Sequence, residues 1–150
     1  GLAPPGMIER SYDDVLAWAK ATTTPEGTRV IDQEWVQVNL ARVRSGIEYL
    51  TLLNWKVAAL EASGQSVNPA DASSIKVFGT EFFTDAYQLL MEIVGQGSAL
   101  TPGSPAAVLA GRLDRGFQGT TILTFGGGVN EIQRYLIAMF GLGMPRMPRM

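Results

Sequence analysis

Three consecutive glycines, Gly126, Gly127 and Gly128, are the first feature of the sequence that could do chemistry. They precede a segment predicted to be helical from Asn130, and a helix N-terminus offers free N–H groups and the positive end of a dipole. Glycine also lets the backbone approach an anion closely. The segment lacks the Gly-Lys-Ser/Thr ending of a P-loop and the spacing of a dinucleotide fingerprint. The pattern therefore fits either an anion-contacting turn or a flexible lead into the helix.

Acidic side chains are the second group with chemical potential. A carboxylate-bridged di-iron site in a helical bundle takes a Glu-x-x-His from each of two helices, and this sequence contains no His. It contains no Cys either, so thiolate, Cys-His and Ser-His-Asp chemistry are excluded within the chain. We expect no metal site and interpret the acids as solvated faces or caps. The acids considered are Asp13, Asp14, Glu81, Asp85 and Glu131.

The composition describes one globular domain. The chain has 150 residues, of which 46% are apolar, enough for a buried core. The net charge is −2 without a basic run, which argues against a nucleic-acid partner. No signal peptide is visible, no apolar run reaches the length of a membrane span, and the lack of cysteine suits a reducing cytoplasm. The chain does not begin with Met, which suggests a piece of a longer protein or a processed product.

Hydrophobic periodicity places these residues on helices. The pattern predicts helices over Met7–Ala21, over Gln33–Ser63 with Asp32 as its cap, and from Asn68-Pro69 to Val94, where Gly95 ends the helix. A shorter helix over Ala106–Arg115 and a last one from Asn130 to about Phe140 complete the chain. We predict an all-α fold, an antiparallel bundle of four main helices in one domain over residues 1–150.

Each long helix has an apolar stripe at alternating spacings of three and four. The predicted stripes are Ile8, Tyr12, Val15 and Ala19; Val36, Leu40, Val43, Ile47, Leu50 and Val57; and Phe78, Phe82, Ala86, Leu89 and Ile93. Several large residues of the second long helix fall partly off its stripe, so we expect a second buried face, in the core or at an interface. These residues are Trp35, Leu52, Leu53 and Trp55.

The end of the chain resembles a known family. The run Gly126-Gly127-Gly128-Val129-Asn130-Glu131-Ile132-Gln133-Arg134, with the tail Gly141-Leu142-Gly143-Met144-Pro145-Arg146, is similar to the end of acyl-CoA dehydrogenases. There a Gly-Gly-Thr-x-Glu-Ile-Gln-Arg turn precedes a helix and a Leu-Gly-Leu-Pro-Arg tail. The stretch Leu90-Met91-Glu92-Ile93-Val94-Gly95-Gln96 is similar to the family's Gln-x-x-Gly-Gly segment at the end of a long helix.

The resemblance implies a function. It implies that the chain is the C-terminal helical domain of an FAD-dependent enzyme whose N-terminal helical and middle β-domains are absent from these residues. The enzyme takes an acyl-CoA, a glutamate removes the α-proton, and the product is a trans-2-enoyl-CoA. Electrons pass to an electron-transfer flavoprotein. The FAD contacts implied in this chain are Glu92, Gly95, Gly126, Gly127, Gly128, Val129 and Glu131.

This sequence departs from the family at several contact positions. Gly127 stands where many members have the catalytic glutamate, and Val129 where they have a flavin-binding Thr. Glu92 replaces the usual Gln, and Gln96 replaces the second Gly. An Arg-x-x-Phe-Gly motif is expected near Thr23–Gly27, where its arginine is missing. No catalytic residue is therefore expected in these 150 residues, which we expect to be inactive alone.

Two interpretations of these departures stay open. One is a branch whose base lies on an earlier helix, upstream of Gly1; Glu9 superficially resembles that base motif but lies about a dozen residues too late by spacing to Gln37. The other is a subunit that works with a related partner, as in the actinobacterial heterotetrameric dehydrogenases of steroid side-chain degradation, a branch of lipid metabolism. A different class of function is a helical interaction module or structural subunit without catalysis.

Overall fold

The computed structural model describes residues 3–146, and over this range the fold is helical. The helices are α1 (Gly6–Ala21), α2 (Glu34–Ala62), α3 (Pro69–Val94), α4 (Arg112–Leu123) and α5 (Asn130–Leu136). Short 3₁₀ segments cover Val30–Asp32, Gly95–Ala99 and Val108–Gly111, and a π-helical turn, Ile137–Gly141, prolongs α5. Extended pairing within residues 3–146 is limited to one bridge between Thr23 and Arg29. The predicted all-α fold is confirmed.

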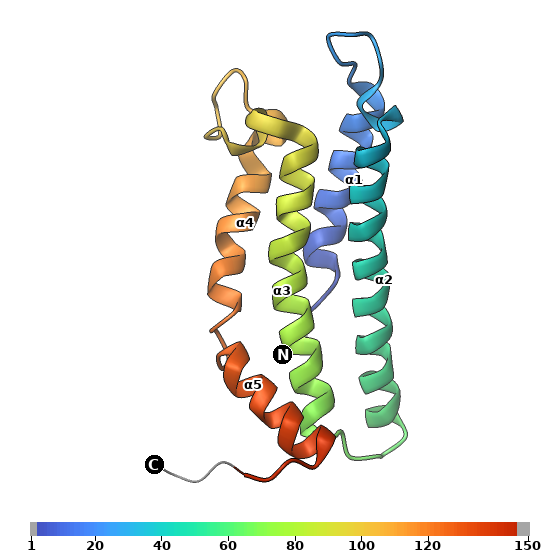
Figure 1. Ribbon diagram of the computed structural model, residues 1–150, viewed down its shortest axis with the longest axis vertical. Coiled ribbons are helices and arrows are strands. Elements are labelled where there is room, and N and C mark those ends of the chain that lie inside the picture. The colour runs from blue at the N-terminus through green and yellow to red at the C-terminus, as the bar shows by residue number, and fades with distance from the viewer. Residues whose placement is uncertain (1–2, 147–150) are drawn as a thin grey trace.

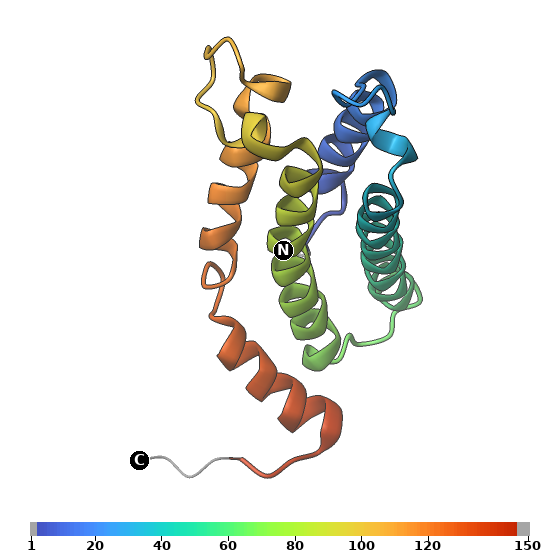
Figure 2. The ribbon, with the colours of Figure 1, turned by 45° about the horizontal axis from the view of Figure 1, so that its top comes forward.

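The helices run alternately up and down, as an antiparallel bundle requires (Figure 1). The fourth position of the bundle is shared, because α4 lies along the C-terminal half of α3 and α5 along its N-terminal half (Figures 1 and 2). Helix α3 is central and packs against α1, α2, α4 and α5. The chain is therefore a four-helix bundle whose last helix is broken at the glycine turn.

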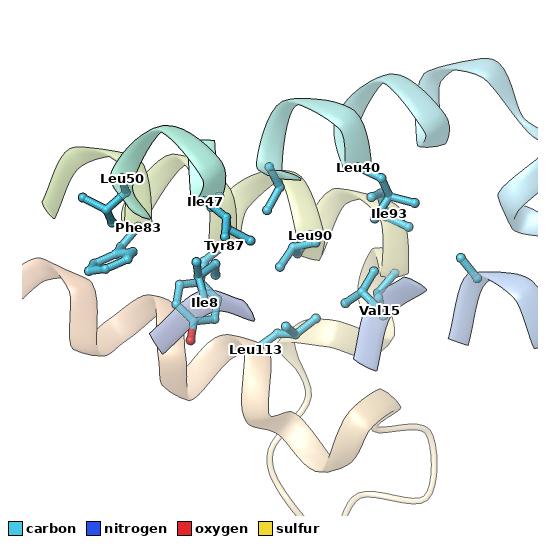
Figure 3. Packing of buried hydrophobic residues seen from close by; sticks show 14 of the residues in the cluster. Ile8, Val15, Leu40, Ile47, Leu50, Phe83, Tyr87, Leu90, Ile93 and Leu113 are labelled. Carbon is cyan, nitrogen blue, oxygen red and sulfur yellow. The ribbon is translucent and has the colours of Figure 1, made fainter. Parts of the chain in front are cut away.

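The core lies between α1, α2 and α3 and is closed by α4 (Figure 3). Ile8, Val15 and Ala19 of α1 are fully buried, as their spacing predicts. All six residues of the predicted α2 stripe are buried as well. Leu113 is the fully buried apolar side chain that α4 contributes.

The predicted stripe of α3 needs a correction. Ala86 and Ile93 are buried, but Phe78, Phe82 and Leu89 are only half-buried, and the fully buried large side chains are Ile75, Phe83 and Leu90. The reason is the central position of α3: a helix with neighbours on several sides buries most of its circumference, and a single stripe no longer describes it.

Helix ends follow local chemistry in some places and not in others. The Asn68 side chain accepts the amide of Ala70, with Pro69 at the first helical position, and the helix stops at Gly95 with φ 74°, as predicted. The prediction that Asp32 caps α2 is wrong. Gln33 is the N-cap, without a side-chain cap bond, and Asp32 instead accepts two hydrogen bonds from the Arg29 guanidinium.

The predicted helix over Ala106–Arg115 is also wrong in its bounds. Helix α4 runs from Arg112 to Leu123, straight through Gly116 and Gly119. A Cβ on Gly116 would lie 2.4 Å from the ring of Tyr87 on α3, so this glycine serves close helix packing. Tertiary contact overrides the low helix propensity of glycine here.

Candidate functional site

The glycine turn joins α4 to α5 and is open to solvent. Residues 125–129 are all exposed, and Gly127 and Gly128 have φ values of 73° and 103°. Side chains rarely adopt these values, which explains the glycines. The amide of Gly126 donates to the Ile122 carbonyl at 2.8 Å, and the amide of Asn130 donates to the Thr124 carbonyl at 3.1 Å. The backbone of the turn is therefore ordered yet accessible to a ligand.

Gly127 has free space around it. A Cβ there would meet nothing within 4 Å, whereas a Cβ on Gly128 would lie 2.7 Å from the Gln133 side-chain amide. No neighbouring side chain therefore occupies the space beside Gly127, the position that matches the family's turn glutamate. Ligand atoms can approach the backbone at Gly127 without displacing protein atoms.

Apolar side chains surround the turn on the surface. Ile122 and Phe125 precede it, Val129 ends it, and Ile132 follows in the first turn of α5; all four are exposed. Large exposed apolar side chains grouped in one place are typical of binding surfaces. We call these four residues the turn rim.

A polar network behind the turn anchors α5 to α3. Asn130 is 4% exposed, and its side-chain amide donates to Thr80 Oγ1 and Glu81 Oε1, both at 3.1 Å. Arg134 donates to both Glu81 oxygens at 2.8 Å. From the other side, Lys76 Nζ donates to the Asn130 Oδ1 and to the Thr124 carbonyl. A buried amide must be fully paired, and Asn130 is.

Burial lowers the pKa of Lys76, and the negative charges of Glu131 and Glu81 partly offset that effect. Glu131 is itself exposed, and its effect on Lys76 is that of a nearby negative charge. Sequence reasoning did not single out Lys76. The available signal was that it is the one basic residue in the sequence of α3.

A small cavity of about 160 Å³ lies between the start of the chain, α3 and the glycine turn. It is largely apolar, with the polar atoms of Lys76 and Thr80 on one side. The residues that line it include Met7, Lys76, Thr80, Phe83, Leu123 and Gly126. The cavity lies between the first turn of α1 and the turn region and is partly open to solvent.

Glu9 does not belong to the lining of this cavity. It is half-buried in the first turn of α1, on the helix face shared with Tyr12 and Leu16 rather than with Met7. The structure therefore does not bring Glu9 and the glycine turn together around this cavity.

The other predicted contact residues lie far from the turn. Glu92 and Gly95 are at the C-terminal end of α3, whereas Lys76 and Thr80 near its beginning meet the turn. At 1.5 Å per residue, Lys76 and Glu92 are about 24 Å apart along the helix. Glu92 accepts a hydrogen bond of 3.0 Å from the buried Asn39 of α2. The predicted cofactor residues thus form two separate surfaces in this chain.

The loop after α1 carries an arginine that sequence reasoning missed. Arg29 lies just beyond Thr23–Gly27, where the family motif is expected, and pairs with Asp32 at 2.8 Å. This pairing lowers the pKa of the exposed Asp32 carboxyl through its hydrogen bond with Arg29. The Arg29 guanidinium therefore lies near the end of α1, where it is paired with Asp32.

Within residues 3–146, no group of three acidic side chains is placed to hold a metal ion. Over the same residues, none of the helices has both the length and the apolar character needed to cross a bilayer.

Comparison with known proteins identifies relatives of this chain. The sequence model of the family described as acyl-CoA dehydrogenase, C-terminal domain, matches residues 1–142. The chain is 48% identical over 150 residues to acyl-CoA dehydrogenase FadE26 of Mycobacterium tuberculosis, covering 99% of the chain and 38% of that protein. The chain therefore spans less than two-fifths of the length of this curated relative.

Two solved structures have the same fold. The ChsE4–ChsE5 complex of Mycobacterium tuberculosis matches with a TM-score of 0.91 and 50% identity, over 98% of this chain and 38% of the matched one. The Tcur3481–Tcur3483 steroid ACAD matches with a TM-score of 0.84 and 40% identity, over 94% of this chain and 35% of the matched one.

Proposed function

The chain belongs to the acyl-CoA dehydrogenase family, and from this premise we propose that it is the C-terminal bundle of one subunit of a heteromeric, FAD-dependent dehydrogenase. The substrate is an acyl-CoA, and the product is the trans-2-enoyl-CoA. The observation that carries the proposal is the glycine turn, whose backbone is ordered, exposed and free of side-chain bulk at Gly127.

The residues present fit a flavin. Its ring system has flat apolar faces and hydrogen-bonding edges, and the turn offers exposed backbone beside the apolar turn rim. We assign Gly126, Gly127, Gly128, Val129 and Glu131 to flavin contacts, at the surface where α4 meets α5. Bound FAD would supply the chemistry of accepting a hydride from the β-carbon, and electrons would leave to an acceptor of the electron-transfer flavoprotein type.

Glu92 and Gly95 are assigned to a second contact surface. Because they lie about 24 Å and about 28 Å from Lys76 along α3, they would meet a different part of a cofactor, or a cofactor held by a neighbouring subunit. The Asn39–Glu92 hydrogen bond fixes that carboxylate from α2. This separation supports an assembly in which subunits share cofactor sites.

The role of this chain is to orient the cofactor and to cover the site. It does not supply the group that removes the proton. Gly127 has no side chain, so the base must come from outside these residues or from a partner subunit. A steroid side-chain CoA thioester is the substrate class we favour, because one related solved structure is a steroid ACAD. A related acyl-CoA dehydrogenase subunit is the partner, as in the ChsE4–ChsE5 complex.

One observation favours a second function, a non-catalytic partner subunit. The turn lacks a carboxylate at Gly127, and the only arginine near Thr23–Gly27 on its C-terminal side, Arg29, is paired with Asp32. Such a subunit would complete the partner's site and hold no flavin of its own.

A flavin absorbance measurement separates these functions. The complete protein is purified alone and after co-expression with a candidate partner subunit, and both samples are assayed for acyl-CoA oxidation. Flavin and activity only in the co-purified complex support a shared site. Flavin bound by the protein alone excludes the non-catalytic role, and the absence of flavin and turnover in every combination overturns the proposal.

A further inference from the structure

Lys76 reaches both ends of the glycine turn from the N-terminal part of α3, the neighbouring helix. Its ammonium group donates to the Thr124 carbonyl at 3.0 Å and to Asn130 Oδ1 at 2.5 Å. Thr124 is the last residue before the exposed segment 125–129, and Asn130 is the first residue after it. The Lys76 ammonium group thus contacts both the residue before and the residue after segment 125–129.

None of the residues 125–129 has a buried side chain. They are all solvent-exposed, and Gly126, Gly127 and Gly128 have no Cβ that could pack. Glycine has the widest choice of backbone conformations, so a run of three loses much conformational entropy when it is fixed. The contacts at its two ends therefore have a large share in deciding which conformation the turn adopts.

The other hydrogen bonds of Asn130 orient its side chain for the contact with Lys76. Its amide nitrogen donates to Thr80 and Glu81, which fixes the orientation of the side chain and points the oxygen at Lys76. Charge-assisted hydrogen bonds of this kind are stronger than neutral ones. The cation is partly buried and its pKa is lowered by that burial, so folding places it here against a desolvation cost.

Helix α5 has an independent attachment to α3. Arg134 forms two hydrogen bonds of 2.8 Å with Glu81, one turn beyond Asn130. Loss of Lys76 should therefore leave α5 docked and loosen only the turn, which keeps the backbone hydrogen bond from the Asn130 amide to the Thr124 carbonyl. This separates a role in positioning the turn from a general role in holding the bundle together.

We propose that Lys76 is a positioning residue that fixes the glycine turn in the conformation that binds FAD, acting through the Thr124 carbonyl and the Asn130 side chain. The inference rests on the proposed function, in which this turn contacts the flavin. Lys76 contributes by pre-organisation: the turn is already ordered when the cofactor arrives, and the entropy of ordering it is not subtracted from the binding free energy.

The test compares three variants of the complete protein, with its partner subunit if flavin binding requires one. Lys76→Met keeps the length of the side chain and removes the charge and the donors. Lys76→Arg retains both. Lys56→Met is the matched control, because it removes an exposed lysine whose ion pair with Asp71 lies elsewhere on the bundle. FAD dissociation constants are measured by titrating the apoproteins, and hydrogen exchange is followed at residues 124–130 and along α5.

We expect Lys76→Met to raise the FAD dissociation constant by about tenfold or more, the range of one charge-assisted hydrogen-bonded contact. Lys76→Arg should recover most of the affinity, and Lys56→Met should stay within about twofold of the wild type. Exchange should accelerate in the turn of the Lys76→Met apoprotein while α5 stays protected. Unchanged FAD affinity in Lys76→Met, or exchange that accelerates equally along α5, overturns the inference.

Failure of the proposed function would give a different result from failure of this inference: the wild type itself would bind no FAD in any combination of subunits. Should circular dichroism show that Lys76→Met does not fold, Asn130→Ala takes its place. It removes the acceptor of Lys76, together with the donors to Thr80 and Glu81, and leaves both the Thr124 contact and the attachment of α5 through Arg134. Its FAD dissociation constant should rise about threefold to tenfold, and no rise overturns the inference.

Discussion

Gly127 shows how one residue can be free in space and still constrained by its backbone. A Cβ there meets nothing within 4 Å, yet φ is 73°, a value that L side chains rarely adopt. We expect Gly127→Ala to destabilise the protein by about 1 kcal/mol through backbone strain alone.

The control for this prediction is Gly119→Ala in the interior of α4. Gly119 also has open space around it, but its backbone is helical, so alanine should stabilise the helix by up to about 1 kcal/mol. Thermal unfolding of both variants would check the opposite signs. Equal effects would contradict the assignment of the cost to φ.

Lys76 should give the protein a pH dependence of its own. Burial lowers its folded pKa below the ordinary value of 10.5. At neutral pH the amine is charged in both states, and the desolvation penalty opposes folding in full. As the pH rises through the window between the folded pKa and 10.5, the folded state releases its proton first, and stability increases relative to a protein without this group.

The measurement is the difference in free energy of unfolding between wild type and Lys76→Met, from about pH 7 to about pH 10. We expect this difference to shift in favour of the wild type as the pH rises. The carboxylates and lysines common to both proteins cancel in the difference. A difference that is flat, or that moves toward the variant, would show that Lys76 is not desolvated as described.

At the scale of the helices, two glycines allow close packing against aromatic rings. A Cβ on Gly116 would lie 2.4 Å from the ring of Tyr87, and one on Gly46 would lie 2.1 Å from the ring of Phe82. The two rings differ in freedom. Tyr87 is buried and its hydroxyl donates to the Met7 carbonyl, whereas Phe82 is only half-buried.

We therefore expect Gly116→Ala to cost more than Gly46→Ala, although the closer contact is at Gly46. Overpacking against a fixed ring should cost about 2 to 3 kcal/mol, and displacement of the freer Phe82 ring about 1 kcal/mol or less. Chemical denaturation of the two variants gives both values. The reverse order would mean that Phe82, which stacks on Phe78 at 5.6 Å, is held more firmly than its exposure indicates.

For the whole molecule, the face of α2 opposite the core is an exposed apolar surface among the described residues. Trp35, Val38 and Leu52 are 42–58% exposed and lie at helical spacings on that face. The sequence predicted a second buried face for α2. Among the described residues, Leu53 packs against the core while Trp35, Leu52 and Trp55 are exposed, so burial of this face requires residues outside these 150.

The isolated chain should therefore self-associate or dissolve poorly, because exposed apolar area of this kind associates in water. Light scattering at micromolar concentration checks this. Leu52→Lys should reduce the association, whereas Ala72→Lys, at an exposed site on α3, adds the same charge away from the face and should not. A stable wild-type monomer would contradict the prediction.

The 150 residues by themselves should not oxidise acyl-CoA. Gly127 offers no base, and the two predicted cofactor surfaces lie about 24 Å apart along α3 rather than around one site. Turnover is measured with added FAD and a dye acceptor, and the complete protein with its partner serves as the positive control. Measurable turnover by these residues alone would contradict the expectation.

The sequence by itself determined the elements whose signals are local. Helix periodicity located α1, α2, α3 and α5, the Asn68-Pro69 pair and Gly95 marked the ends of α3, and the glycine-rich run marked the turn. These features depend on residues within a few positions of one another, where capping geometry and hydrophobic spacing act directly.

Only the tertiary structure decided the rest, because the deciding contacts join distant residues. Helix α4 runs through Gly116 because Tyr87, far away in the chain, packs there, and α3 loses its single stripe because it has neighbours on several sides. The hydrogen bonds from Lys76 to Thr124 and Asn130 join residues about fifty positions apart in the sequence. No local pattern encodes such a contact, since it exists only after α3 and α5 have packed together.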